Sequence, residues 1–497
     1  MNRYMPNRAK VKSIDLALLL LAFFAYRVWL LTQPWVGVYH DEAYYFHWSL
    51  IPDFGYYSKP PMIAWVIGLS SSLFGAGAFG IKLGPAICWF LSGLTIAAIA
   101  RHIWDGRTGW LAGVIFYTTP LAGFYSLFAT TDSVLLLCWS LSLLGFIKAQ
   151  RAHSLGTENL SWWLLAGLAT GLGLLSKYTL ITLPFAYLLF MLANARRRAQ
   201  FGTLGPWMAG LVALALFSLN IFWNITNDFV AWRHTSEIAQ IDEGSLLNPL
   251  SMITFWLEQV AIFGLISTLL IIRWREKIIA AVSISEPLQV IVLASSVLFV
   301  GISVQALLSR AFANWAAPVI VGLTFALVVV ARQHPKAVLS AITFNLLLLS
   351  GFYHWPQAIA ALGIDNTKQN NPWLRVEPWA ERLAAEGRFP AGTLDLPIAS
   401  DSRAILANLT RVLQPGVFPS RYWENDTHRV ADYYDQTINF DSLPRQGRWL
   451  FATDHPMTTE QRRSFQRVTF HSEVPSYYQW RPGKTLFLYS VENFNGY

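Results

Sequence analysis

Long apolar stretches dominate the first 350 residues of the chain and predict membrane-spanning helices. Each stretch approaches the ~20 residues that a helix needs to cross the hydrocarbon core of a bilayer. Two neighbouring stretches are shorter and are separated by the sequence Ser-Lys-Tyr at residues 176–178, which indicates a pair of short spans. The pattern predicts about eleven spans, at residues 16–31, 81–100, 110–128, 134–147, 162–175, 178–193, 207–223, 250–272, 288–308, 313–331 and 337–352.

The composition agrees with a membrane protein. Of the 497 residues, 54% are hydrophobic and only 13% are charged, which is too apolar for a soluble protein of this size. The net charge of +8 lies in the membrane part, because the tail from Tyr353 onward has fifteen basic and fifteen acidic residues. A basic surface for nucleic acid is therefore not indicated. The predicted fold class is an α-helical polytopic membrane protein.

The distribution of Lys and Arg predicts the orientation of the chain. An odd number of spans places the two termini on opposite sides, and Lys and Arg accumulate in cytoplasmic loops. With the N-terminus inside, sixteen of these residues fall in inside segments and five in outside segments. We therefore expect a cytoplasmic N-terminus and an external C-terminal tail. No cleavable signal peptide is expected, since no small-residue cleavage site follows the first apolar stretch.

The tail has a different character from the rest of the chain. We expect a membrane domain at residues 1–354 and a small soluble α/β domain on the periplasmic side at residues 355–497. The segment 401–413 has helical apolar spacing, and the segments 447–453 and 485–491 have the pattern of strands. Both cysteines fall inside predicted spans, so the tail has no disulfide framework.

A polar cluster follows the first span, in a predicted external loop at about residues 34–75. Its sequence YHDEAYYFHWSLIPDFGYYSKPP, residues 39–61, places Asp41, Glu42 and Lys59 among aromatic side chains. The aromatic belt at the membrane surface is expected to include Tyr44, Tyr45, Trp48 and Trp65. A single loop acid or base is ordinary. Together with acids and bases of other external loops, however, these residues predict a cavity at the outer membrane face.

Five segments, in this order, carry a resemblance to a known family: HDEAYYFHWS, GYYSKPPMIAWVIGLSSSLFG, TTDSVLLLCWSLSLLGF, GLGLLSKYTL and FANWAAPVIVGL. They resemble the bacterial membrane glycosyltransferases of the GT-C fold. This group includes the dolichyl-phosphate-mannose protein mannosyltransferases and the aminoarabinose transferases of lipid A. The resemblance covers roughly residues 14–330 and implies the GT-C fold for the membrane part.

The resemblance implies an inverting glycosyltransferase that uses a polyprenyl-phosphate-linked sugar donor. The acceptor would be lipid A, lipopolysaccharide or another cell-envelope glycan on the outer side of the inner membrane. The sequence agrees, because it contains no Gly-rich loop of the kind that holds nucleotide phosphates. Asp41 matches the family's first acidic residue and is the expected general base. Glu42 would orient the acceptor or a metal.

The donor phosphate requires cations. Lys59 matches the family lysine before the double proline, and Arg310 and Lys177 are further candidates for phosphate binding. Asp132 matches a family acid and is expected either to contact substrate or to cap the following helix. Tyr44, Tyr57 and His234 complete the expected substrate contacts.

The resemblance does not carry over a complete metal site. Ser58 stands where the lipid A enzymes have an acidic residue before the lysine, so no metal ligands are assigned. No cofactor is identified from the sequence, and a divalent metal ion remains an alternative. The expected partners are the lipid-linked donor, the lipid or glycan acceptor and membrane lipids.

Two alternative functions remain open at this point. One is an enzyme resembling the protein O-mannosyltransferases, which would act on Ser or Thr. The other is a transporter or a lipid-binding protein without catalysis. A transporter usually places charges near the membrane midplane, and only Arg27 and Glu258 lie well inside predicted spans. We expect Arg27 to extend its side chain toward water.

Overall fold

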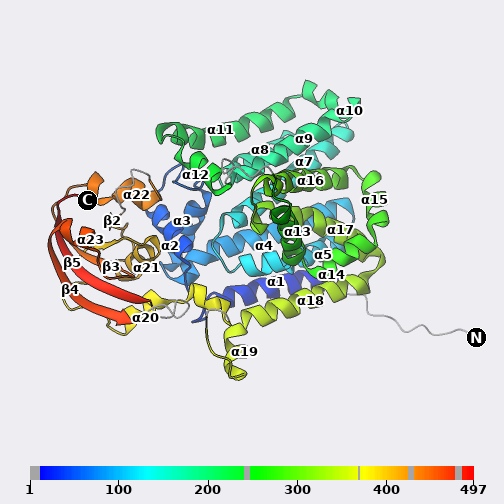
Figure 1. Ribbon diagram of the computed structural model, residues 1–497. Helices are drawn as coiled ribbons and strands as arrows, with labels where there is room; N and C mark the ends of the chain where they lie inside the picture. The colour runs from blue at the N-terminus through cyan, green and yellow to red at the C-terminus, as the bar shows by residue number, and fades with distance from the viewer. Residues whose placement is uncertain (1–11, 240–246, 368–369, 424–429, 476–483) are drawn as a thin grey trace, which may run out of the picture.

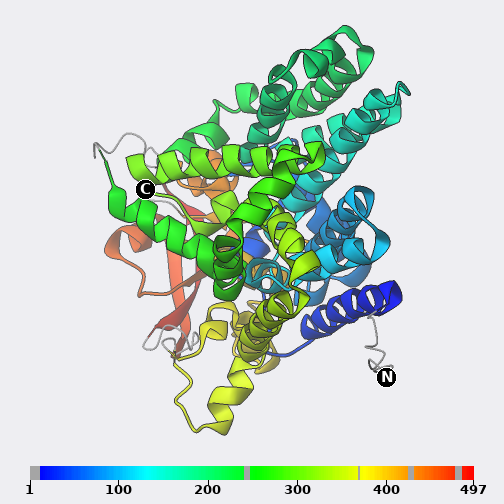
Figure 2. The same cartoon turned by 90° about the vertical axis from the view of Figure 1, so that its right-hand side faces the viewer.

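The computed structural model describes residues 12–239, 247–367, 370–423, 430–475 and 484–497. A large helical part forms most of the molecule, and a five-stranded sheet with its helices lies at one end of it (Figure 1). The view turned by 90° shows α1 at the rim of the helical part (Figure 2). Only 17% of its most apolar window is buried inside the protein, which suits a helix that faces lipid.

The helical part runs from the first helix to residue 361. Its helices are α1 (Ser13–Leu30), α2 (His40–Leu50), α3 (Met62–Phe74), α4 (Ala78–Ile103), α5 (Gly106–Tyr117), α6 (Pro120–Tyr125), α7 (Thr131–Ser154), α8 (Leu160–Leu174), η1 (Tyr178–Ile181), α9 (Thr182–Leu192), α10 (Ala195–Arg198), η2 (Ala199–Gly202), α11 (Leu204–Thr226), α12 (Val230–Ala239), α13 (Pro249–Phe263), α14 (Leu265–Arg273), α15 (Arg275–Ser283), α16 (Glu286–Leu308), η3 (Ala313–Ala316), α17 (Val319–Gln333), α18 (Pro335–Tyr353) and α19 (Trp355–Ala361).

Membrane character is evident from these helices. Within the described residues, six helices are long and apolar enough to cross a membrane, or up to eight if each of two bent helix pairs counts as one span. The six are α1, α4, α7, α11, α16 and α18. Three shorter apolar helices, α3, α8 and α17, add to the bundle. The protein is therefore a membrane protein, while the count of eleven spans stays a prediction.

The predicted span at residues 250–272 does not continue as one straight helix. α13 and α14 meet at Gly264 with a bend of 101°. Gly264 has a φ of +107°, which favours glycine, and a Cβ atom there would lie 2.3 Å from Asn345 Oδ1 on α18. Hydropathy does not register such a break, because both halves are equally apolar.

Arg27 does not extend toward water as expected. Its side chain is buried against neighbouring helices and is only 2% exposed. The guanidinium donates to the hydroxyl oxygen of Tyr353 at 3.1 Å and to the carbonyl oxygen of Tyr117 at 2.6 Å. A charged group in an apolar interior is stable only when its donors are satisfied in this way, so Arg27 joins α1 to α5 and α18.

The C-terminal part is built on one mixed sheet. Its strands lie in the order β2-β1-β3-β5-β4, with β1 parallel to β2 and β3 and with β5 antiparallel to β3 and β4. The helix and both strands predicted for this region are present. The elements are η4 (Pro372–Val376), α20 (Trp379–Ala385), β1 (Ile398–Ser400), α21 (Arg403–Leu413), β2 (Arg421–Tyr422), α22 (Tyr433–Ile438), η5 (Phe440–Ser442), β3 (Arg448–Thr453), α23 (Thr459–Arg463), β4 (Phe465–Pro475) and β5 (Thr485–Phe494).

The two parts share one apolar core. Tyr44 and Trp48 of α2 are fully buried, and their rings pack against Tyr434 and Tyr433 of α22. The expectation that Tyr44 and Trp48 lie in an aromatic belt is therefore wrong. Burying rings of this size contributes strongly to stability, so α2 is held between the helical part and the sheet.

Candidate active site

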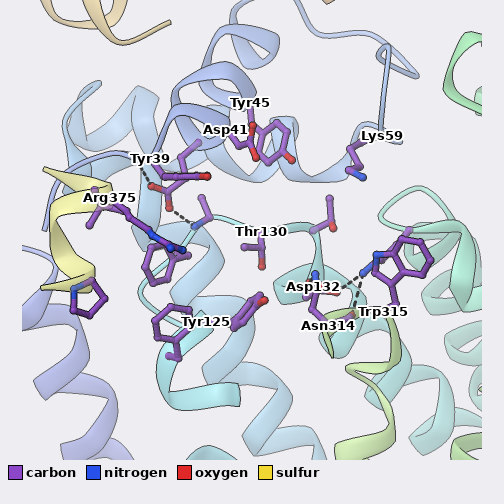
Figure 3. Close-up of a pocket in the computed structure, with 18 of the residues that line it drawn as sticks. Tyr39, Asp41, Tyr45, Lys59, Tyr125, Thr130, Asp132, Asn314, Trp315 and Arg375 are labelled. Carbon is purple, nitrogen blue, oxygen red and sulfur yellow. Dashed lines mark hydrogen bonds and ion pairs between the residues drawn. The ribbon is translucent and has the colours of Figure 1, made fainter. Parts of the chain in front are cut away.

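A pocket of about 490 Å³ lies where α2, the loop before α3, the start of α7, η3 and η4 meet. This volume is in the range of small-molecule sites. Of the sequence candidates, the pocket is lined by Asp41, Glu42, Lys59, Asp132 and Lys177. Figure 3 shows Asp41 and Tyr45 on one wall, with Tyr125, Asp132 and Asn314 on the facing side. The structure thus brings together side chains from separate regions of the sequence, at residues 39–59, 124–132, 177, 314–315, 352 and 372–376.

Glu42 is the buried anchor of this pocket. Its carboxylate accepts hydrogen bonds from the backbone N–H of Tyr39 at 2.7 Å and of Ala129 at 2.6 Å. The Lys82 ammonium on α4 lies 2.6 Å from Glu42 Oε2, and both side chains are almost fully buried. With these partners Glu42 has little capacity left for an acceptor or a metal. Its geometry favours a structural role that fixes the start of α2.

Lys82 is not among the site residues expected from the sequence. In the structure it has an exposed fraction of 0% and also donates to the carbonyl oxygen of Leu127 at 3.1 Å. A buried lysine requires a paired carboxylate. The sequence carries one signal for this role, since Lys82 stands near the start of a long apolar segment.

Asp41 differs from its neighbour because it faces the pocket. Its side chain is 38% exposed, and its Oδ1 lies 3.0 Å from the Arg403 guanidinium of α21. The ring of His40 is 3.7 Å away. Burial lowers the pKa of Arg403, but Asp41 and nearby Tyr44 and Asp432 outweigh this effect and raise it. The carboxylate is therefore held beside a permanent cation and still has access to the pocket.

Lys59 reaches the pocket from the loop between α2 and α3. Two backbone hydrogen bonds between Tyr56 and Lys59 close the turn that positions it. Its pKa is lowered to about 8, first by burial and second by the neighbouring Lys177, although Asp132 and Asp41 act in the opposite direction. Among the described residues, its ammonium has no hydrogen-bond or ion-pair partner.

Asp132 and Lys177 form a second ion pair across the pocket. Lys177 Nζ lies 2.8 Å from Asp132 Oδ1, and the Asn314 side-chain amide donates to Asp132 Oδ2 at 2.8 Å. The N-cap residue of α7 is Thr130, so the alternative of Asp132 as the cap is wrong. Because Lys177 is already paired, Lys59 is the better-placed cation for a phosphate.

Four predicted site residues lie outside the pocket lining. Arg310 donates to the carbonyl oxygen of Ile238 at 2.8 Å, and Tyr44 is buried against α22. Tyr57 donates to the carbonyl oxygen of Val430 at 2.8 Å, and the His234 ring packs 4.8 Å from it. These contacts stabilise the surroundings of the pocket and give no support for substrate contacts.

Several lining residues were not identified from the sequence. They are Tyr39, Tyr45, Phe124, Tyr125, Phe128, Ala129, Thr130, Thr131, Asn314, Trp315, Phe352, Pro372, Trp373, Arg375 and Val376. Tyr39 and Tyr45 belong to the quoted loop, and Asn314 and Trp315 lie within the quoted FANWAAP segment. Arg375 comes from the tail, where no motif pointed to a site. Within the described part of the chain, no group of three or more His, Cys, Asp or Glu side chains is placed to hold a metal ion, so no metal site is assigned.

Comparison with known proteins places this geometry in context. The family model of dolichyl-phosphate-mannose-protein mannosyltransferase matches residues 58–223. The lipid A galacturonosyltransferase RgtD of Rhizobium johnstonii is 29% identical over 493 residues, covering 95% of this chain and 97% of RgtD. An undecaprenyl phosphate-alpha-4-amino-4-deoxy-L-arabinose arabinosyl transferase of Erwinia tasmaniensis is 30% identical over 169 residues, which cover 33% of this chain and 30% of that protein.

The fold matches a solved structure over nearly its whole length. ArnT from Cupriavidus metallidurans in the apo state superposes with a TM-score of 0.66 at 16% identity, covering 97% of this chain and 98% of ArnT. The chain is a glycosyltransferase with the GT-C fold. The same ArnT has also been solved bound to undecaprenyl phosphate, with a TM-score of 0.66 at 16% identity over 95% of this chain and 97% of ArnT. For this glycosyltransferase, the pocket at Asp41 is the candidate active site.

Proposed function

We propose that this glycosyltransferase moves a sugar from a polyprenyl-phosphate-linked donor to a hydroxyl group of lipid A or a related envelope glycan. The observation that carries the proposal is that Asp41, an accessible carboxylate, and Lys59, an unpaired cation among the described residues, line the same pocket. The full-length relative is named a lipid A galacturonosyltransferase, and ArnT was solved with undecaprenyl phosphate. Both names agree with this donor and acceptor class.

In the proposed reaction, Asp41 is the general base. The acceptor hydroxyl oxygen attacks the anomeric carbon, and its proton moves to the Asp41 carboxylate. The bond between the anomeric carbon and the phosphate oxygen breaks, and the lipid phosphate leaves with the electron pair. Attack from the face opposite the leaving group inverts the configuration, as in inverting glycoside chemistry.

Lys59 is the proposed partner of the donor phosphate. Charge develops on the leaving phosphate oxygen as the glycosidic bond breaks, and a fixed cation in a site with little water stabilises that charge strongly. Arg403 acts on Asp41 rather than on the donor in this scheme. By holding Oδ1 at 3.0 Å, it orients the carboxylate and leaves Oδ2 for the acceptor proton.

The tail takes part in the site under this proposal. We infer a membrane domain at residues 1–354 that carries the base and the phosphate partner, and a domain at residues 355–497 that completes the pocket. Trp373, Arg375 and Val376 of η4 line the pocket, and Arg403 of α21 contacts Asp41. The two regions would have to assemble before catalysis is possible.

The proposed location is the bacterial inner membrane, with the N-terminus in the cytoplasm and the tail in the periplasm. The excess of Lys and Arg in the inside segments supports this orientation. A reporter that is active only outside the cytoplasm should be active after Tyr497 and silent at Arg197. Reversed signals would place the pocket on the cytoplasmic side and contradict the proposal.

The function is tested with purified protein in nanodiscs. Polyprenyl-phosphate-linked sugars are supplied with lipid A, and mass spectrometry of the lipid product measures the transfer. A Ser/Thr peptide is supplied as the competing acceptor. Mass spectrometry of envelope lipids from a deletion strain should show loss of the same modification. Transfer to the peptide and not to the lipid would favour the protein O-mannosyltransferase alternative instead.

A further inference from the structure

The carboxylates of the pocket are neutralised within the protein. Each of the three has a cation partner: Asp41 pairs with Arg403 at 3.0 Å, Glu42 with Lys82 at 2.6 Å and Asp132 with Lys177 at 2.8 Å. Any further cation in the lining therefore has no carboxylate of the pocket left for it. Its charge is available to a ligand.

Two such cations line the pocket. Among the residues that the structure describes, neither Lys59 nor Arg375 has a side-chain hydrogen bond or an ion pair. They enter from opposite sides in the close-up, with Asp41 and Tyr45 between them (Figure 3). A single phosphate group held by Lys59 would leave Arg375 unmatched. Arg375 is exposed at this side of the pocket, so its guanidinium is open to a second anionic group of a ligand that reaches it.

Arg375 stands on a well-anchored backbone. It belongs to η4, where Asn371 Oδ1 accepts a hydrogen bond from the Trp373 backbone N–H at 3.0 Å. The Trp373 indole N–H donates to the carbonyl oxygen of Phe352 at 2.7 Å, and its side chain is buried. These contacts fix the backbone at Arg375, so only the freedom of the side chain is lost when it binds a ligand.

The chemistry of the guanidinium indicates which anion it binds. Its planar set of N–H donors matches the two oxygens of a carboxylate in a bidentate contact. On the donor, the phosphate is already matched to Lys59, so the second anion would belong to the sugar ring. A sugar with an amino group would bring a positive charge beside Arg375 and be disfavoured.

We propose that Arg375 binds the carboxylate of an acidic donor sugar, of the uronic acid class, and so determines donor specificity. This proposal rests on the proposed function, because it assumes a polyprenyl-phosphate-linked donor in the same pocket. Lys59 would recognise the phosphate common to all such donors. Arg375 would recognise the group that distinguishes one donor from another.

The test compares three donors that share the same lipid phosphate. They carry galacturonic acid, galactose or 4-amino-4-deoxyarabinose, and galacturonic acid differs from galactose only in its carboxylate. Donor binding and transfer to lipid A are measured separately for the full-length protein in nanodiscs. We expect the galacturonic acid donor to have the highest kcat/KM. Arg375→Gln should lower kcat/KM for this donor by about 10- to 100-fold, which corresponds to the loss of one charge-assisted contact. For the other two donors, kcat/KM should change by no more than about twofold.

Two variants sharpen the comparison. Arg375→Lys should restore part of the preference for galacturonic acid, since it returns the charge without the planar fork. Lys59→Ala should weaken the binding of all three donors equally, because they share the phosphate.

Each opposing result has its own meaning. If Arg375→Gln lowers kcat/KM equally for all three donors, the assignment is overturned and Arg375 binds an anion on the acceptor. A decrease in kcat/KM that depends on lipid A phosphorylation would have the same meaning. A preference for the galactose or amino-sugar donor in the unmodified protein would also overturn it. Failure of the protein to bind or transfer any of the three donors would contradict the proposed function itself.

Discussion

Arg403 Nη2 lies 3.0 Å from Asp41 Oδ1, although the two residues are 362 positions apart in the sequence. Asp41 stands at the start of α2, and Arg403 is the first residue of α21 in the sheet part. The Arg403 guanidinium also lies over the Tyr44 ring, 4.9 Å from its centre. The C-terminal part therefore reaches the proposed catalytic base directly, and this contact can be tested by mutation.

Replacing Asp41 by Asn should abolish most of the turnover. The substitution keeps the shape of the side chain but removes the proton acceptor, so kcat should fall by at least ~100-fold while donor binding survives. Transfer rate and donor affinity are measured in nanodiscs. Asp53→Asn is the matched control, because Asp53 lies in the same loop outside the pocket and its carboxylate accepts a hydrogen bond from Trp223 at 2.8 Å. Near-normal transfer by Asp41→Asn would refute the assignment of the base.

Donor affinity should decrease at alkaline pH. Lys59, whose pKa is lowered to about 8, is a cation below that pH and neutral above it. The phosphodiester of the donor stays anionic on both sides of that pH. Donor affinity should therefore be highest below about pH 8 and decrease as the pH rises above it. Donor binding is measured between pH 7 and 10. Lys59→Arg should bind with little change over this range, because guanidinium stays charged. Equal pH dependence in both proteins would exclude Lys59 as the cause.

Removal of the Arg403 side chain should slow the reaction without weakening donor binding. In Arg403→Gln, Asp41 loses the contact that orients it, and a misplaced base costs about 10- to 100-fold in kcat. The donor KM should stay constant, and Arg403→Lys should recover part of the rate. Arg421→Gln is the control, since Arg421 lies outside the pocket lining, where its guanidinium donates to the backbone carbonyl oxygens of Ser420 and Pro444 and lies over the Trp449 ring. A change confined to KM would show that Arg403 acts on the donor.

The buried pair of Glu42 and Lys82 should be required for stability. Glu42→Gln leaves the Lys82 ammonium buried without a negative partner, and breaking a buried ion pair in this way costs about 3–5 kcal/mol of unfolding free energy. The double variant Glu42→Gln/Lys82→Met should lose less unfolding free energy than the single variant, because it leaves no unpaired buried charge. Thermal unfolding in detergent measures both effects. Glu276→Gln serves as the control, since Glu276 is exposed and should leave the midpoint unchanged. A stable single variant would contradict the proposed anchoring role.

Much of the helical part could be predicted from the sequence. Transfer of apolar side chains into lipid is a local, additive property of a segment, so spans such as α4, α7 and α16 are recognisable without knowledge of their neighbours. In the tail, the strands β3 and β5 and the helix α21 are recognisable from the apolar spacing within each segment, which is also a local property. The resemblance that rests on the segments around Asp41 and Lys59 also indicated the fold and the kind of reaction. These features depend on short stretches of sequence.

The partners of the site residues were decided only by the tertiary structure. The loop motif marks Asp41 and Glu42 alike, but packing buries Glu42 against Lys82 and leaves Asp41 open to the pocket. Arg403 and Arg375 come from a region with no catalytic motif. Ion pairs and hydrogen bonds act over a few ångströms in space, and sequence separation carries no information about that distance. Hydropathy and motifs therefore predicted the membrane protein and its reacting loop, while the folded chain determined which charges are paired and which remain for the substrate.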